Sequence, residues 1–145
     1  MTKKRKHVLL IKRIHKDAEL PSYHYESDIG LDLTSIEDVS FRPNEQKAIR
    51  TGLVIKIPDN HVGLIRDRAG IVSEMNLHTV AGTFDPGYRG EVSVVLVNFS
   101  EEEVLIEKGM KIAQLLIIPI LKVNVKEVKE LDETERGDKG FKKVK

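Results

Sequence analysis

The chain has 145 residues, enough for one domain with its own core, and a formal net charge of +1, so no global field draws it to nucleic acid or membrane. It has no cysteine, which excludes disulfides and cysteine-based metal sites and favours a reducing compartment, the cytoplasm. No apolar run reaches the roughly 20 residues of a membrane span, and Lys12 and Arg13 interrupt the first apolar stretch. We therefore expect neither a membrane segment nor a secretory signal.

Short strands dominate the predicted secondary structure. Apolar and β-branched residues predict strands at 7–14, 46–57, 62–66, 91–99 and 112–120. One short helix is predicted at 69–75, where Ile71, Val72 and Met75 share a face that we assign to the core. The nearly continuous apolar runs of the later strands are typical of burial on both faces, as at a subunit contact. A buried helix is the alternative for 112–118, but Pro119 disfavours it. The pattern predicts an all-β sandwich or jelly roll.

The composition changes near the C-terminus. Residues 126–145 are highly charged and contain few apolar side chains, which predicts a tail that is mobile in the free protein. We therefore expect a β domain over 1–130 and a mobile tail over 131–145. Phe141 has no local core to join in this tail, so we expect it to fold onto a partner or a planar ligand.

The segment from Gly82 to Glu91 is the most informative part of the chain. It places Asp85 and Tyr88 on a turn that also holds Pro86 and three glycines, between two apolar strands. Glycine permits backbone conformations that bring main-chain N–H and C=O groups close to a ligand. The alternative is a tight, solvated hairpin, which needs only one glycine.

Three further segments carry polar residues in unusual settings. Asp32 lies among apolar neighbours, so its carboxylate must face either backbone N–H groups or a cation. The segment Arg66-Asp-Arg-Ala-Gly70 begins the predicted helix, where N–H groups and an arginine can bind phosphate; the alternative is a salt bridge within the triplet. Gln114 interrupts an apolar strand, so its amide is expected to contact a polar group, or a backbone group within the core.

Taken in order, these segments resemble the five motifs of the trimeric deoxyuridine triphosphatases (dUTP diphosphatases, dUTPases), from about Ser27 to Phe141. The resemblance implies a β jelly roll that forms a homotrimer, with active sites at the subunit boundaries and the tail closing over them. It also implies that the chain hydrolyses dUTP to dUMP and pyrophosphate with Mg²⁺. This reaction keeps uracil out of DNA and supplies dUMP for thymidylate synthesis.

The resemblance assigns a role to each motif residue. Asp85 resembles the general base that orients the attacking water, and Tyr88 resembles the ring that leaves no room for a ribose 2′-hydroxyl. Asp32 matches an aspartate near the metal-bound water. The remaining substrate-binding matches are the uracil-reading strand Val80, Ala81, Gly82, Thr83 and Phe84; the phosphate cradle Arg68, Ala69 and Gly70; Gln114 near the phosphates; Arg136 at the γ-phosphate; and Phe141 stacked on uracil.

The chain departs from the family pattern at several positions. Ala69 replaces the usual serine, Met110 and Lys111 replace an acidic residue and an arginine, and 142–145 replaces a run of small residues. Two alternatives share the fold. A dCTP deaminase or bifunctional enzyme needs a catalytic glutamate at the position of Val95, and an apolar residue cannot transfer protons. A non-catalytic nucleotide-binding trimer would not need the Asp85 turn intact.

Overall fold

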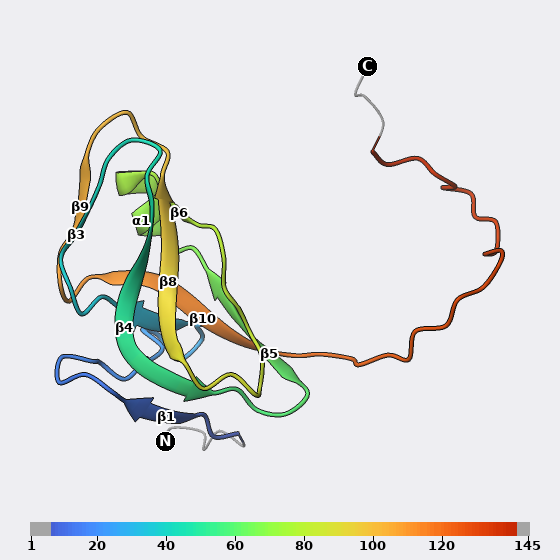
Figure 1. Cartoon of the computed structure of the whole chain (residues 1–145), viewed down its shortest axis with the longest axis horizontal. Helices are drawn as coiled ribbons and strands as arrows, with labels where there is room; N and C mark the ends of the chain where they lie inside the picture. Colours follow the sequence, from blue (N-terminus) through green and yellow to red (C-terminus); the bar gives the residue numbers. More distant parts are fainter. Residues whose placement is uncertain (1–6, 142–145) are drawn as a thin grey trace.

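A computed structural model of the chain describes residues 7–141 and shows a β-sandwich with a long C-terminal tail (Figure 1). Two four-stranded antiparallel sheets have the strand orders β1-β4-β8-β6 and β2-β10-β5-β7, and a small sheet pairs β3 with β9. The elements are β1 (Leu10–Arg13), β2 (Leu31–Thr34), β3 (Val39–Phe41), β4 (Gln46–Lys56), β5 (His61–Arg66), α1 (Ala69–Met75), β6 (Leu77–Thr79), β7 (Thr83–Phe84), β8 (Glu91–Asn98), β9 (Val104–Ile106) and β10 (Lys111–Pro119). The prediction of an all-β jelly roll with one short helix is confirmed.

Both four-stranded sheets contribute to one apolar core. The longest pairing joins β4 to β8, and buried side chains alternate along the first half of β8, from Val92 to Val94 and Leu96. The side chains between them are only partly buried within one chain, so the expected burial of the later strands on both faces at a subunit contact stays a prediction. The end of β10 is also uncovered, because Ile117 is only partly buried and Ile118 is 36% exposed.

Two predicted strands are shorter than expected. The first covers only Leu10–Arg13, because these are the residues that pair with β4 at the edge of its sheet. The predicted strand over 80–84 is reduced to Thr83–Phe84. Residues 80–82 instead cross from one sheet to the other, since Val80 N–H donates to Val95 O at 3.1 Å and Ile65 N–H donates to Gly82 O at 2.8 Å.

The predicted helix is confirmed at Ala69–Met75, directly after β5. Ile71 is buried and Met75 packs against the core, as the shared face predicted. The helix ends at Asn76, which has a left-handed backbone (φ 51°) and donates its N–H to Val72 O. Among residues 7–141 we find no helix with the length and apolar character that a bilayer crossing requires.

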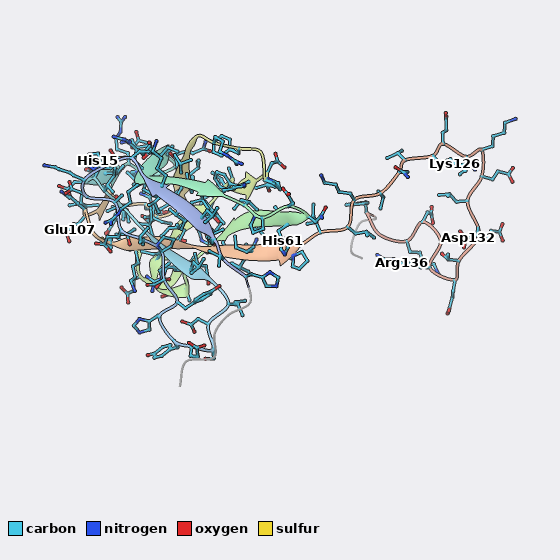
Figure 2. All side chains as sticks on the ribbon, turned by 90° about the horizontal axis from the view of Figure 1, so that it is seen from below. His15, His61, Glu107, Lys126, Asp132 and Arg136 are labelled. Carbon is cyan, nitrogen blue, oxygen red and sulfur yellow. The ribbon has the colours of Figure 1, made fainter. Side chains whose placement is uncertain are left out.

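The tail leaves the sandwich after β10 and extends away from it (Figure 1). Figure 2 shows Lys126, Asp132 and Arg136 along this segment, well apart from the side chains of the sandwich. Every tail residue from 120 to 141 is exposed. The exposed segment therefore begins near residue 120, at the end of β10.

Candidate active site

The predicted site residues of the sandwich, except Val80, lie in two separate pockets. The first, which we call the basic pocket, has a volume of about 330 Å³ and is lined by His24, Tyr25, Asp28, Gly30, Asp32, Arg68, Ala69, Gly70 and Gln114. The second, which we call the turn pocket, has a volume of about 300 Å³ and is lined by Ala81, Gly82, Thr83, Phe84, Asp85, Tyr88, Ser93 and Val95. The two pockets share no lining residue.

The Asp32 carboxylate organises the basic pocket. It is 9% exposed, and its Oδ1 lies 3.0 Å from Arg68 Nε. Its Oδ2 lies 3.1 Å from Lys111 Nζ, in an ion pair without hydrogen-bond geometry. The sequence left two kinds of partner open for this carboxylate, backbone N–H groups or a cation. The structure shows that its partners are cations. A buried carboxylate needs such compensation. Asp28, a second carboxylate, also lines the pocket, so the two cations are matched by two carboxylates.

Arg68 is held in place from two sides. Besides its ion pair with Asp32, its Nη1 donates to the main-chain oxygen of Lys111 at 3.1 Å. The alternative was a salt bridge within the Arg66–Arg68 triplet. Arg68 instead pairs with Asp32, outside the triplet. Lys111, at a position where the family pattern has an arginine, supplies a second cation to Asp32.

Gln114 is fixed by its neighbours at the floor of the basic pocket. Its Nε2 donates to the main-chain oxygen of Asp67 at 2.8 Å, which confirms that the amide has a polar, backbone partner. Gly30 lies directly beside its other amide atom: a Cβ at this position would stand 2.0 Å from Gln114 Oε1. Glycine is therefore required at position 30 if Gln114 keeps this rotamer.

Ala69 and Gly70 form the open rim of the basic pocket at the start of α1. No side chain caps this helix, so its first N–H groups have no intrahelical or capping acceptor. A Cβ added at Gly70 would meet nothing within 4 Å, so the backbone there is open to a ligand. Such N–H groups favour anions.

The turn pocket presents Asp85 and Tyr88 from one compact turn. Tyr88 N–H donates to Asp85 O at 3.1 Å, and the Tyr88 hydroxyl donates to Glu91 O at 3.1 Å. The Tyr88 ring lies 5.6 Å from the Phe84 ring, centre to centre. The Asp85 side chain is exposed beside these rings, where a carboxylate can accept a hydrogen bond from water. Val95 forms an apolar wall of this pocket.

Gly82 shapes the entry to the turn pocket. Its φ of +141° and the position of Ile65, whose Cβ would lie 2.6 Å from an added Cβ, both exclude larger residues. Val80 does not line the pocket and is 45% exposed.

Asp67 directly precedes Arg68 of the basic pocket and carries a perturbed carboxylate. Its Oδ1 accepts Thr79 N–H at 2.6 Å, and its Oδ2 lies 3.2 Å from His78 Nδ1. Burial opposes ionisation of this group, but the hydrogen bonds from Thr79 and His78 outweigh it and lower the pKa of Asp67.

The tail residues are not brought to either pocket within one chain. Arg136 Nε donates to Lys139 O at 3.1 Å, a bond local to the tail, and the Phe141 side chain is fully exposed. The replaced segment 142–145 lies outside the described residues.

The sequence analysis missed several residues that the structure adds to the pockets. His24, Tyr25 and Asp28 belong to the loop before β2, and Asp67 was considered only as part of a charged triplet. The only available signal was Asp28, a second carboxylate one short turn before Asp32. Among residues 7–141, no three His, Cys, Asp or Glu side chains group together as metal ligands.

The fold and its two pockets define the class of the protein as a jelly-roll β-sandwich, and comparisons identify the family. The dUTPase family model matches residues 16–144. The deoxyuridine 5′-triphosphate nucleotidohydrolase of Clostridium kluyveri is 50% identical over 135 residues, or 92% of this chain and 94% of the relative. Its counterpart from Clostridium tetani is 44% identical over 137 residues, 93% of this chain and 94% of the relative.

Solved structures of dUTPases have the same fold as this chain. A dUTPase variant from Staphylococcus bacteriophage 80α, with bound dUpNHpp, superposes with a TM-score of 0.89 at 30% identity, over 94% of this chain and 97% of that chain. A dUTPase variant from phage phi11 of S. aureus, in which a structural Mg(II) ion is coordinated, gives a TM-score of 0.82 at 26% identity, over 88% and 100%. The chain belongs to the dUTPase family.

Proposed function

We propose that the chain is a dUTP diphosphatase that hydrolyses dUTP to dUMP and pyrophosphate, with the Asp85 carboxylate as general base. The match to the dUTPase family over residues 16–144 carries this proposal, because that range includes both pockets. In a cell the reaction limits uracil incorporation into DNA and supplies dUMP for thymidylate synthesis.

The chemistry requires a positioned water and neutralised phosphate charge. Asp85 orients a water molecule toward the α-phosphorus and accepts its proton as the new P–O bond forms. The bond from the α-phosphorus to its bridging oxygen breaks, and pyrophosphate leaves. A positioned general base contributes about 10²–10⁴-fold to such a step. The exposed position of Asp85 in the turn pocket supports this role.

The turn pocket selects the nucleoside. The main chain of residues 80–84 is proposed to read the uracil edge, and residues 81–84 line the pocket. The Tyr88 ring would pack against the deoxyribose, and its hydroxyl bond to Glu91 O fixes the ring there. A fixed ring leaves no room for a 2′-hydroxyl, so UTP would be excluded sterically. The apolar wall at Val95 offers no proton carrier for deamination.

The basic pocket receives the phosphates. Arg68 offers guanidinium donors, Gly70 offers an open backbone, and Gln114 offers its amide at the pocket floor. Asp32 lines the same pocket, and its Oδ2 is buried beside Lys111 Nζ. By its match to the family aspartate near the metal-bound water, Asp32 would hold Mg²⁺ through the water shell of the ion, with the substrate phosphates as the main ligands, and that ion would neutralise phosphate charge.

The active site is proposed to form between chains of a homotrimer. Within one chain the two pockets are separate, Arg136 lies away from the sandwich (Figure 2), and Phe141 is fully exposed. The exposed apolar residues Ile118, Ile120 and Leu121 at the root of the tail support a subunit contact. The tail, 131–145 in the sequence-based division, would then close over a neighbouring site and exclude water.

A nucleotide panel tests the proposed activity. The protein is incubated with dUTP, UTP, dCTP and dTTP in the presence of Mg²⁺, and pyrophosphate and ammonia are measured. We expect pyrophosphate from dUTP only. Comparable turnover of all four would reject the specificity, no turnover would favour a binding-only trimer, and ammonia from dCTP would favour a deaminase.

A mixing experiment tests the shared site separately. Arg68→Gln and Asp85→Asn remove one function each from the basic pocket and the turn pocket. If each site combines pockets from different chains, mixed trimers of the two inactive variants contain some intact sites, so co-refolding restores part of the activity. If both pockets serve one site within a chain, the mixture stays inactive.

A further inference from the structure

The segment from Ile65 to Arg68 connects the two pockets within the chain. Ile65 N–H donates to Gly82 O at 2.8 Å, at the end of the 80–82 crossover. Asp67 O accepts the Gln114 amide at 2.8 Å, and Arg68 pairs with Asp32 at 3.0 Å, both in the basic pocket. A displacement of this segment would therefore change the geometry of both pockets.

The Asp67 side chain holds the other end of the crossover. Its Oδ1 accepts Thr79 N–H at 2.6 Å, one residue before the crossover begins. Its Oδ2 faces His78 Nδ1 at 3.2 Å, and the His78 ring in turn lies 5.3 Å from the Phe99 ring. Residues 80–82 are thus fixed at their start by Asp67 and at their end by Ile65, which belong to the same short segment.

This arrangement matters because the crossover is short and lies between two paired strands. Thr79 ends β6, which pairs with β8, and Thr83 begins β7, which pairs with β5. Between them Ala81 is exposed and Val80 has one hydrogen bond to β8. A main chain that reads a base edge must hold its N–H and C=O groups within a few tenths of an ångström. Loss of the Asp67 contact leaves the start of the crossover held by the β6–β8 pairing and the Val80 bond alone, which allows it to shift.

We infer that Asp67 is a positioning residue that sets the base selectivity of the enzyme by fixing the crossover, an inference that rests on the proposed function. Asp67 lines neither pocket, so it touches no substrate and acts through Thr79 and His78. Its removal is expected to weaken discrimination between uracil and cytosine. Sugar discrimination should persist, because Tyr88 is fixed separately through Glu91.

The test compares kcat/KM for dUTP, dCTP and UTP in the wild type and in Asp67→Ala, Asp67→Asn and His78→Phe. Asp67→Ala loses both contacts and is expected to lower the dUTP-to-dCTP ratio by about tenfold to a hundredfold. Asp67→Asn keeps an oxygen for Thr79 N–H, so it should retain more of the ratio. His78→Phe keeps a ring against Phe99 and removes only the contact to Asp67. Asp59→Asn, an exposed carboxylate in another turn, is the control.

Two internal readouts separate positioning from a general loss of structure. The dUTP-to-UTP ratio and inhibition by pyrophosphate should both stay within about twofold of wild type, because these report on Tyr88 and on the basic pocket. The inference would be overturned if the folded variants kept the wild-type dUTP-to-dCTP ratio, or if kcat/KM fell equally for all three nucleotides. If Asp67→Ala does not fold, the dUTP-to-dCTP ratios of Asp67→Asn and His78→Phe decide between the outcomes. A wild type that hydrolyses no dUTP would instead reject the proposed function.

Discussion

The Nε atom of Arg68 lies 3.0 Å from Oδ1 of Asp32, and this ion pair joins the start of α1 to β2. Lys111 of β10 completes the group at 3.1 Å from Oδ2. Three segments that are distant in sequence are thus tied together around one buried carboxylate. The cations that compensate this buried carboxylate thus stand beside the site where phosphates are proposed to bind.

Replacing Arg68 should therefore affect both binding and stability. Arg68→Gln removes the guanidinium from Asp32 and from the proposed phosphate site, so we expect a higher KM for dUTP. The free energy of unfolding should fall by about 1–3 kcal/mol, since a buried carboxylate loses one of its two cations. Initial-rate kinetics and urea unfolding measure the two effects. Arg42→Gln, an arginine whose side chain is 79% exposed, is the matched control. A variant with an unchanged KM would contradict the phosphate-binding role.

Asp85→Asn tests the general base. The amide keeps the shape of the side chain but cannot accept a proton, so turnover should fall by about 10²–10⁴-fold. Binding of a non-hydrolysable dUTP analogue, followed by calorimetry, should change little. Asp59→Asn serves as the control, because Asp59 is exposed in a turn outside both pockets. Wild-type turnover in Asp85→Asn would remove this residue from catalysis.

Gly30→Ala tests the fixed position of Gln114. The new methyl group would stand 2.0 Å from Gln114 Oε1, so the amide must move and lose its bond to Asp67 O. We expect a stability loss of about 1–3 kcal/mol from overpacking and a reduced kcat/KM for dUTP. Thermal unfolding and pyrophosphate release measure these changes. Gly87→Ala is the control for the thermal unfolding measurement, because an added Cβ at Gly87 meets nothing within 4 Å. Equal losses of stability in the two variants would show that the Gln114 contact is not responsible.

Truncation after Leu131 tests the tail. Residues 132–141 are exposed, so their removal should leave the melting temperature of the sandwich unchanged. Activity should fall, because Arg136 and Phe141 would no longer reach a bound nucleotide. The substitution Phe141→Ala in the full-length chain isolates the stacking contribution, about 1–3 kcal/mol for a base on an aromatic ring. Full activity of the truncated protein would reject the closing role.

The pH dependence of stability should report on Asp67. Its pKa in the folded protein is lowered from the ordinary value of 3.8, because hydrogen bonds from Thr79 and His78 outweigh the effect of burial. A lowered pKa contributes stability at pH values above 3.8, and that contribution is lost as the pH falls through the folded value. The difference in unfolding free energy between wild type and Asp67→Asn should therefore be constant near neutral pH and shrink below pH 4, about the ordinary pKa of an aspartate. Urea unfolding across this range measures it. A difference that grows toward acid would contradict the assignment.

Much of the fold could be predicted because its longer elements carry local signals. The strand at Gln46–Lys56 and the helix at Ala69–Met75 show β-branched content and helical spacing that propensity rules detect. The edge strand at Leu10–Arg13 and the two-residue strand at Thr83–Phe84 were mispredicted in length, because their bounds depend on which partner residues face them. Pairing across sheets leaves no local trace in sequence.

The site could be predicted in part for a similar reason. Asp32, Arg68 and Gln114 were named individually, and the structure brings all three into one pocket. The contacts of Asp67 with Thr79 and His78 could not be foreseen, since they depend on the crossover between the sheets. The stacking of Phe141 on uracil, which the resemblance implied, stays a prediction, because within one chain that ring is fully exposed.

The uncovered apolar end of β10 bears on how the protein accumulates in a cell. Ile118, Ile120 and Leu121 are 36%, 41% and 87% exposed, so a single chain presents apolar side chains to solvent. If the proposed trimer covers these side chains, quality-control proteases and aggregation would remove unassembled chains faster than assembled ones. The yield of assembled protein would then rise more steeply than in proportion to the rate of synthesis, since doubling the supply of chains also shortens the time each spends alone.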